Sequence, residues 1–256
     1  MEVICWSAPT VAENLAMDDA AVRSAWATGL RRLRFWWGGP PAVVMGPSER
    51  PEQVVDAEAC ARLGVDLLKR STGGGSVLLT GDMLSYSLIT PAPANLDLKA
   101  GFRPGIDLIC AILAAFGVVG RPEGTSDVAV GDRKISGNAQ ARRWKAILVH
   151  GTLLVDFDPE LAECVLKHPP REPVYRRGRA HRDFLVTLRS LGVNADRAVI
   201  ERIALAAARQ VFGLVNHYET LRMDVDSCGC GTWASAPSAT PAIVGRVREG
   251  VGGSLA

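Results

Sequence analysis

No stretch of this 256-residue sequence contains 18 uninterrupted apolar residues, so we expect no segment to span a membrane. The N-terminus carries Glu2 and has no basic region before an apolar run, which argues against a signal peptide. A charge excess is also missing, because 29 basic and 27 acidic residues leave a net charge of +2, without the footprint of a nucleic-acid-binding protein. We therefore expect a cytoplasmic protein whose partners are neither membranes nor nucleic acids.

The sequence has six cysteines and four histidines but no pattern typical of a disulfide framework or a metal centre. Cys228 and Cys230 form a single close pair with no second pair at zinc spacing, and the histidines show no finger pattern. The other four cysteines lie in apolar surroundings, where a buried thiol is the commoner interpretation: Cys5, Cys60, Cys110 and Cys164. No metal site is predicted.

Two familiar phosphate-binding motifs are missing as well. No Gly-Lys pair followed by Ser or Thr occurs at the spacing of a Walker loop. The dinucleotide fingerprint fails at Leu78, which stands where its third glycine should be. Any phosphate that this chain binds must therefore be held in another way.

The sequence does contain enough apolar material for a sizeable core, since 48% of its residues are hydrophobic. Its length fits one large domain or a domain with a small annex. Residues 226–256 are rich in Gly, Ser, Ala and Pro and are predicted to form a mobile, low-complexity tail. Residues 1–225 are left for the folded domain.

Helical and strand patterns are mixed along residues 1–225. Thr10 and Glu13 form a capping box that predicts a helix to about residue 28. Further helices are predicted over 52–63, 106–116, 159–166, 195–212 and 214–223. Strands are predicted over 33–37, 42–45, 65–68, 76–79, 84–88, 127–130, 134–140 and 146–154. This mixture indicates an α+β fold with a mixed, largely antiparallel sheet flanked by helices.

The chain is organised around the stretch from Lys69 to Leu79. Gly73, Gly74 and Gly75 follow a cation and a hydroxyl group and separate two short strands. Glycine permits positive φ and close approach of a ligand, so successive N–H groups can form an anion-binding concavity beside Arg70. A glycine-rich hairpin without a ligand explains this stretch, taken alone, equally well.

A second informative stretch runs from Ser126 to Gln140. Lys134 follows a tight turn, and small or polar residues then stand where a core strand would carry Val or Ile: Ser136, Gly137, Asn138 and Gln140. A strand that gives up packing in this way usually lines a ligand site, where a compact cation suits a carboxylate and a phosphate. The alternative is an exposed hairpin with an ordinary surface lysine.

A third stretch, from His168 to Arg182, contains three prolines and five arginines and is predicted to be irregular. The simpler interpretation is a solvated loop. The alternative is a docking surface, whose basic charge would suit an acidic partner.

Taken together, the motifs resemble the lipoate–protein ligase A family, which shares its catalytic fold with biotin protein ligases and lipoyl/octanoyl transferases. The resemblance covers about residues 5–215. It rests on the order of four sequence motifs, which span 13–18, 70–77, 127–140 and 150–154.

The resemblance implies one catalytic domain over 1–225, without the accessory C-terminal domain of the bacterial two-domain ligases. It implies that ATP, with Mg²⁺, activates lipoate (or octanoate) to an acyl-adenylate, and that the acyl group passes to a lysine of a carrier. The implied partner is the lipoyl domain of a 2-oxoacid dehydrogenase or a glycine cleavage H-type protein. A separate accessory subunit is a further possible partner.

The resemblance also assigns site residues. Lys134 is the expected catalytic residue, bridging the acyl carboxylate and the α-phosphate, where it would stabilise developing charge. Arg70 is expected to contact phosphate or adenylate, and Gly137 to give the acyl tail room. The remaining expected binding residues are Gly73, Gly74, Gly75, Ser76, Val77, Leu78, Ser136, His150, Gly151 and Thr152.

This chain departs from the family pattern at two places. Leu79 and Thr80 occupy positions where the family often has His and Asp, and residues 118–130 lack the cysteine nucleophile of the octanoyltransferase branch. The alternatives to the ligase are an ATP-independent octanoyl or lipoyl transferase and a non-catalytic lipoate- or carrier-binding protein. Biotin ligase is a weaker rival, because its Gly-Arg-Gly-Arg loop is absent.

Overall fold

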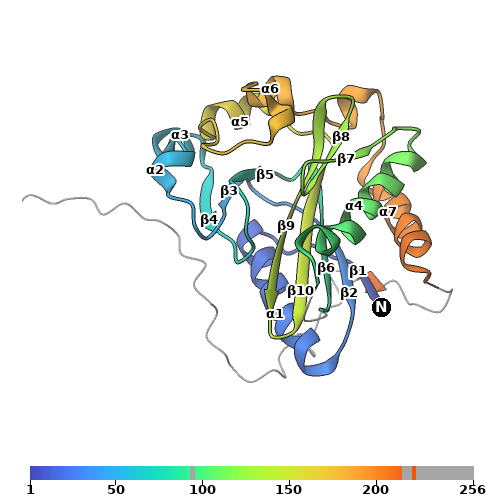
Figure 1. Cartoon of the computed structure of the whole chain (residues 1–256). Coiled ribbons are helices and arrows are strands. Elements are labelled where there is room, and N and C mark those ends of the chain that lie inside the picture. The colour runs from blue at the N-terminus through green and yellow to red at the C-terminus, as the bar shows by residue number, and fades with distance from the viewer. Residues whose placement is uncertain (93–95, 215–220, 223–256) are drawn as a thin grey trace, which may run out of the picture.

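The computed structural model describes residues 1–92, 96–214 and 221–222, and in this part of the chain the strands form two sheets (Figure 1). The larger sheet has eight strands in the order β11-β1-β2-β6-β10-β9-β8-β7, and the smaller has three in the order β4-β3-β5. In that order, the strands of the larger sheet span Leu221–Arg222, Glu2–Cys5, Arg32–Trp37, Met83–Pro91, Ala146–Leu154, Arg133–Arg143, Asp127–Val130 and Arg121–Glu123. Those of the smaller sheet span Asp66–Lys69, Ala42–Met45 and Val77–Leu79.

Helices cover both faces of the larger sheet. Helix α1 contacts β2, β6 and β10, whereas α4 contacts β8, β9 and β10 and packs against α7 (Figure 1). The α-helices α1 to α7 span Val11–Thr28, Pro51–Val54, Ala57–Leu63, Leu98–Ala115, Pro159–Val165, His181–Phe184 and Arg197–Phe212. The 3-10 turns η1 and η2 span Val174–Arg176 and Arg189–Leu191. Among the described residues, no helix combines the length and apolar character needed to cross a bilayer.

Successive side chains along β6 and β10 point to opposite faces of the sheet. Ile89 and Leu148 are a cross-strand pair that packs with α1, and the next pair, Leu88 and Val149, points to the α4 and α7 side. All four side chains are buried, and burial of each contributes about 1.5–3 kcal/mol. The hydrophobic effect therefore fixes the register of the central strands, and with it the position of every polar residue on them.

The predicted α+β fold with a mixed, largely antiparallel sheet is confirmed, since only the β1–β2 and β1–β11 pairs in the larger sheet are parallel. The predicted helix over 52–63 is wrong at its middle, where Val55 leaves the helix to form a bridge with Leu166. The prediction for 214–223 is wrong at Leu221–Arg222, which form a strand that pairs with β1. Leu214 is described and lies outside any helix, while residues 215–220 and 223, and the predicted tail over 226–256, lie outside the described residues.

Helix α4 begins eight residues before its predicted start at 106. The Asp97 carboxylate caps it by accepting hydrogen bonds from the backbone N–H groups of Lys99 and Ala100. Pro104 lies inside this helix. Because a proline removes a helical hydrogen bond, the sequence alone predicts that the helix starts after Pro104.

Candidate active site

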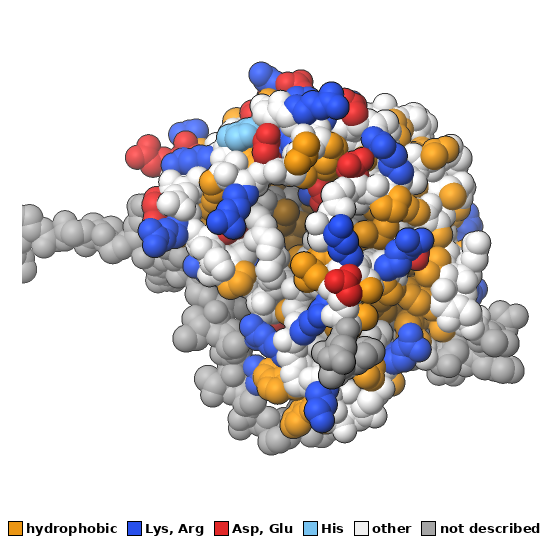
Figure 2. Space-filling view, in the orientation of Figure 1, with side chains coloured by type: hydrophobic (Ala, Val, Ile, Leu, Met, Phe, Trp, Pro, Cys, Tyr) orange, Lys and Arg blue, Asp and Glu red, His pale blue; other side chains and the backbone are white. Residues whose placement is uncertain are grey.

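Two adjoining cavities lie where the smaller sheet meets the β8–β9 hairpin. They have volumes of about 170 and 110 Å³, and both are lined by Ser76, Val77, Lys134, Gly137 and Thr152. After the ligands that the family resemblance implies, we call the cavity of about 170 Å³ the acyl cavity and the cavity of about 110 Å³ the phosphate cavity. The face seen in Figure 2 is hollowed between these elements, and Lys and Arg side chains lie on several sides of the hollow.

Small residues on three strands make room for the acyl cavity. Further along the sheet face that carries Ile89, the cross-strand pairs place small side chains in a row: Ser85, Gly137, Ala139 and Thr152. Trp36 and Leu15 complete the wall, from β2 and α1. The pattern that marked 134–140 in the sequence is therefore a cavity floor rather than an exposed hairpin.

Lys134 stands at the wall that the two cavities share. Its Nζ lies 2.8 Å from Asp127 Oδ1, and its side chain is 25% exposed. Asp127 also accepts a hydrogen bond of 2.9 Å from the Tyr175 hydroxyl, which comes from η1. A Cβ atom at Gly137 would lie 2.7 Å from both Cε and Nζ of Lys134. The glycine thus makes room for the lysine itself, and the carboxylate holds the ammonium at the cavity edge.

Arg70 holds the glycine loop together. It donates four hydrogen bonds, to Thr72 Oγ1 (2.9 Å) and to the carbonyl oxygens of Val44 (3.0 Å), Gly73 (2.8 Å) and Gly75 (2.8 Å). Arg70 lines the acyl cavity but is buried, and burial lowers its pKa to about 10. Four of its five N–H groups are committed to the loop, so its expected phosphate contact remains a prediction.

The three glycines of the loop differ in conformation. Only Gly74 has a positive φ, of 99°, and a Cβ atom at Gly46 would lie 2.1 Å from the Gly74 carbonyl oxygen. The Gly73 N–H group donates to the Gln140 carbonyl oxygen at 3.2 Å and is not free for an anion. The loop is therefore a tight backbone crossing that closes one side of the acyl cavity.

Glu49 and Ser76 join the loop to the phosphate cavity. Ser76 Oγ donates to Glu49 Oε2 at 2.7 Å, and the same oxygen accepts from the Gly46 N–H group at 2.9 Å. Leu78 and Ser136 line this cavity as well. The Ser136 hydroxyl is buried and has no hydrogen-bond partner among the described residues.

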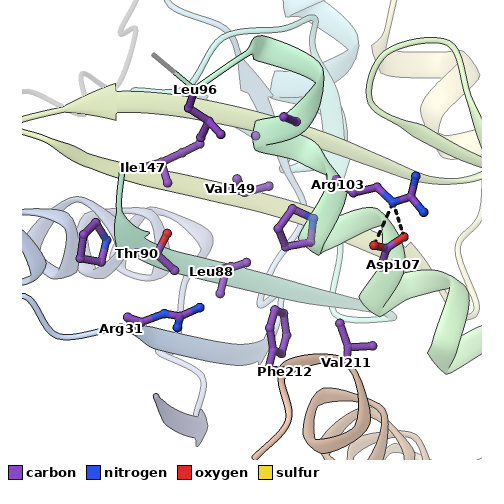
Figure 3. Close-up of a pocket in the computed structure, with 14 residues that line it drawn as sticks. Arg31, Leu88, Thr90, Leu96, Arg103, Asp107, Ile147, Val149, Val211 and Phe212 are labelled. Atoms are coloured by element: carbon purple, nitrogen blue, oxygen red, sulfur yellow. Dashed lines mark hydrogen bonds and ion pairs between the residues drawn. The ribbon is translucent and has the colours of Figure 1, made fainter. Parts of the chain in front are cut away.

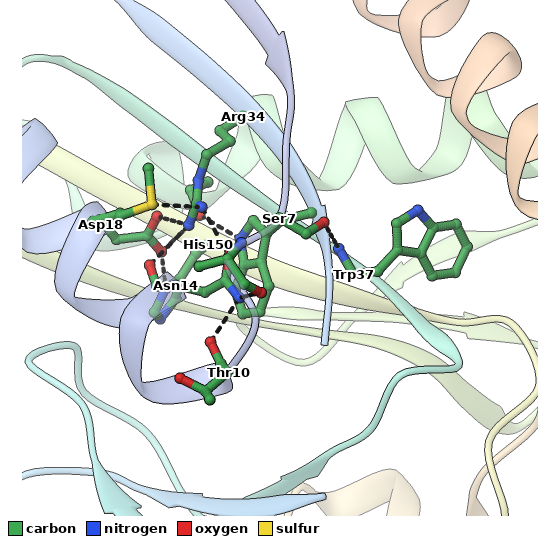
Figure 4. Close-up of polar contacts among 11 residues, drawn as sticks. Ser7, Thr10, Asn14, Asp18, Arg34, Trp37 and His150 are labelled. Atoms are coloured by element: carbon green, nitrogen blue, oxygen red, sulfur yellow. Dashed lines mark hydrogen bonds and ion pairs between the residues drawn. The ribbon is translucent and has the colours of Figure 1, made fainter. Parts of the chain in front are cut away.

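A buried polar network lies beneath the acyl cavity (Figure 4). His150 Nε2 lies 2.7 Å from Thr72 Oγ1, and His150 Nδ1 lies 3.3 Å from Asp18 Oδ2. Asp18 also pairs with Arg34 at 2.8 Å and accepts from the Ser87 hydroxyl at 2.7 Å. Burial alone would raise the pKa of Asp18, but Arg34 and hydrogen bonds from His150 and Ser87 hold it below its usual value.

The network also ties α1 to the sheet. Arg34 donates to Asn14 Oδ1 at 2.9 Å and to the Asn14 carbonyl oxygen at 2.8 Å, while the Asn14 amide donates to the Thr10 carbonyl oxygen. Asn14 and Asp18 are completely or almost completely buried, four residues apart on one face of α1. Sequence reasoning did not assign these residues, although two polar residues at this spacing on the buried face of a capped helix were the available signal.

The structure brings the expected site residues together. Those that line the acyl cavity are Arg70, Gly74, Gly75, Ser76, Val77, Lys134, Gly137, His150, Gly151 and Thr152. Gly73 lies in the same loop, and a Cβ atom at Gly151 would lie 2.0 Å from Asn138 Oδ1. None of the described cysteines lines either cavity.

A larger cavity, of about 530 Å³, lies on the opposite face of the sheet, between α4, α7 and the central strands (Figure 3). Its floor is Leu88, Ile147 and Val149, and the Arg103–Asp107 ion pair lies at its edge. It contains none of the expected site residues, so size alone does not identify the site. Within the described part of the chain, no three His, Cys, Asp or Glu side chains are grouped as a metal site would require.

Comparison with known proteins connects this geometry to a family. The model of the lipoyl protein ligase A/B catalytic domain matches residues 10–207. A relative from Aeropyrum pernix, which carries the name of a lipoate-protein ligase A, is 31% identical over 146 residues. The matched part is 57% of this chain and 54% of that protein. The chain thus spans about half the length of this relative. The octanoyltransferase LipM of Kyrpidia tusciae is 30% identical over 219 residues, which are 73% of this chain and 79% of LipM.

A solved structure shares the fold. It is the bi-partite lipoate protein ligase of Thermoplasma acidophilum, described with its E2 lipoyl domain, with a TM-score of 0.73 and 24% identity over 87% of each chain. At this identity the likeness concerns the fold alone, whereas the family model covers more than half of the chain. The chain therefore belongs to the lipoyl protein ligase A/B catalytic-domain family.

Proposed function

We propose that this protein is an ATP-dependent lipoate–protein ligase, which forms lipoyl-adenylate and transfers the lipoyl group to a lysine of a carrier domain. The observation that carries the proposal is the position of Lys134 on the wall shared by two adjoining cavities. One cavity has a floor of small residues beside Trp36 and Leu15, which suits an acyl chain. The other contains several cations, which suits phosphate.

In this reaction the lipoate carboxylate attacks the α-phosphorus of ATP, and the bond to the β-phosphate breaks with release of pyrophosphate. A cation at the junction of the two cavities can neutralise both the carboxylate and the α-phosphate as they approach. To contact the substrates, the Lys134 ammonium would have to weaken its ion pair with Asp127 or keep it beside the new contacts. Before the substrates bind, this pair, at 2.8 Å, holds the ammonium in position. Mg²⁺ would enter with the triphosphate.

The acyl-adenylate is itself the activated acyl group, so no covalent nucleophile is needed. The second half-reaction requires a neutral carrier lysine, and nearby cations lower the pKa of an incoming amine. We propose a lipoyl domain or an H-type protein as the acceptor, and a cytoplasmic setting for the reaction. The bi-partite architecture of the Thermoplasma protein motivates a search for a separate accessory subunit.

The direct test is incubation with ATP, Mg²⁺, lipoate and an apo carrier domain, followed by intact mass measurement of the carrier. We expect the carrier to gain one lipoyl group, and Lys134→Ala to lower the rate by roughly 100- to 1,000-fold. Lys99→Ala, which removes an exposed lysine outside both cavities, is the matched control. Normal labelling by Lys134→Ala would contradict the assigned role.

The second candidate is an ATP-independent octanoyl or lipoyl transferase, which the similarity to LipM favours. A thioester route needs an accessible thiolate at the site. Among the described cysteines, exposed Cys164 lines neither cavity, and Cys110 is half-buried on α4, where burial raises the pKa of its thiol. Labelling of the carrier from octanoyl-carrier without ATP would support the transferase. Tight binding of lipoate without transfer under either condition would indicate a non-catalytic binding protein.

A further inference from the structure

The phosphate cavity has an excess of positive charge. Its lining includes three cations, Lys134, Lys167 and Arg176, against a single acid, Glu49. The Glu49 carboxylate already accepts hydrogen bonds from Ser76 and from a backbone N–H group. The remaining lining residues are mainly apolar, so the cations are not balanced from within the cavity wall.

Arg176 is the most deeply buried of these cations, with a relative exposure of 5%. Its Nε donates to the Arg179 carbonyl oxygen at 2.9 Å, and its guanidinium lies over the Phe184 ring, 5.0 Å from the centroid. The Glu172 carboxylate is 3.6 Å from Nε, longer than a good charge-assisted hydrogen bond. Nη2 is buried and has no hydrogen-bond partner among the described residues. Burial lowers the pKa of Arg176, and the charges of Glu172 and Glu163 oppose this shift without cancelling it.

The segment that carries Arg176 is fixed on the β8–β9 hairpin. Tyr175 donates to Asp127, the carboxylate that also holds Lys134, and Arg179 pairs with Asp132 at 3.0 Å. The Tyr175 ring packs on Phe184, with centroids 5.0 Å apart. Residues 174–184 are therefore an ordered frame rather than a solvated loop, and the frame fixes Arg176 relative to the Lys134 side of the cavity.

We propose that Arg176 is a phosphate ligand of this site, and that its unpartnered Nη2 donates to a phosphate oxygen in the phosphate cavity. A buried guanidinium donor without a partner costs free energy, which an anionic acceptor recovers. The inference deepens the proposed function and rests on it for the identity of the ligand. In a ligase the phosphate is the departing pyrophosphate of ATP, which takes the electron pair of the broken Pα–O bond. In a transferase it is the phosphodiester of a carrier's pantetheine arm.

Calorimetric titration separates these sources. Inorganic pyrophosphate and 4′-phosphopantetheine are titrated into the wild type, Arg176→Met and Arg176→Lys, with lipoate as a reference ligand. Met keeps an apolar side chain over Phe184, and Lys keeps the charge but loses the fork of donors. Arg177→Met is the matched control, because Arg177 is an exposed neighbour that lines neither cavity. We expect pyrophosphate binding to weaken by roughly 10- to 100-fold in Arg176→Met, with lipoate binding and the control unchanged.

Unchanged pyrophosphate and phosphopantetheine binding by folded Arg176→Met overturns the proposal, as does a wild type that binds neither probe. If Arg176→Met loses phosphopantetheine binding but keeps pyrophosphate binding, the proposal is supported, and the phosphate is that of the carrier arm in a transferase. If both Arg176 variants fail to fold, a crystal structure of the wild type with pyrophosphate decides: a phosphate oxygen within hydrogen-bond distance of Arg176 supports the proposal, and a phosphate seated elsewhere overturns it. Absence of ATP-dependent labelling with intact pyrophosphate binding through Arg176 would instead reject the ligase alone.

Discussion

At the scale of single residues, the absence of one side chain at Gly137 determines where the catalytic candidate can lie. A methyl group there would lie 2.7 Å from the end of the Lys134 side chain, which is flexible and can move away. We expect Gly137→Ala to fold normally but to displace Lys134 from Asp127 and lower kcat/KM for carrier labelling by roughly 100-fold, the cost of misplacing a reacting group by about 1 Å.

Steady-state labelling rates together with lipoate affinity check this expectation. Ala141→Ser, which adds one atom to the same strand outside both cavities, is the control. Weakened lipoate affinity at an unchanged rate with saturating lipoate would show that Gly137 makes room for the acyl chain, as the family resemblance implies, rather than for the lysine.

At the scale of secondary-structure elements, local signals predicted what local interactions determine. The Thr10–Glu13 capping box marks the start of α1 because both of its hydrogen bonds lie within the first turn. The start of α4 was missed because Pro104, together with Gly101 and Gly105, is typical of a helix break. A Cβ atom at Gly105 would lie 1.9 Å from the Tyr86 hydroxyl, so this glycine reflects close packing against β6. The sequence alone does not reveal such a contact.

The residues of the candidate site likewise divide into those that local motifs reveal and those that only the fold brings together. Lys134 and the glycine loop were found because their motifs are continuous in the sequence. The Asp18–Arg34–His150 network was missed because its members come from α1, β2 and β10, and only the sheet register brings them together. Arg176 was assigned to a solvated segment, since charge composition does not reveal that Phe184 and Arg179 enclose it.

We predict that stability depends on pH through His181, which is buried where α6 packs against α5. His181 at the start of α6 lies 3.4 Å from Glu163 on α5, but burial and the charge of Arg176 lower its pKa below the ordinary 6.5. A lowered folded-state pKa means that the stabilisation from neutral His181 is complete above pH 6.5 and is lost as the pH falls through the folded-state value. We expect His181→Gln to reduce the fall in Tm between pH 7.5 and 5.

Thermal melts across this pH range test the assignment. His168→Gln is a suitable control, because His168 is exposed and pairs with Glu172 at the surface. An identical pH dependence in the wild type and His181→Gln would show that other groups determine the acid sensitivity.

At the scale of the whole molecule, the glycine loop joins the two sheets, and Arg70 is one of the residues that connect them. Its guanidinium binds the carbonyl oxygen of Val44 in the smaller sheet, and its partner Thr72 contacts His150 in the larger one. Arg70→Met would remove this donor from the buried Val44 carbonyl oxygen and from the part-buried carbonyl oxygens of Gly73 and Gly75, and a buried group left unsatisfied costs about 1–3 kcal/mol. The buried residues of the two sheets form one cluster, but the hydrogen bonds lost with Arg70 lie within the smaller sheet and the glycine loop. We therefore expect local opening of β3, β4 and β5 rather than global unfolding.

Native-state hydrogen exchange distinguishes these two outcomes. We expect amides of the smaller sheet to lose protection by roughly tenfold or more in Arg70→Met, while β6 and β10 remain near wild type. Arg50→Met, which removes an exposed arginine beside the same sheet, should leave both sheets unchanged. If β6 and β10 lose protection equally, the two sheets unfold as one unit. The cavities between them then open only on global unfolding, and Arg70 supports the whole core rather than the substrate-side loop.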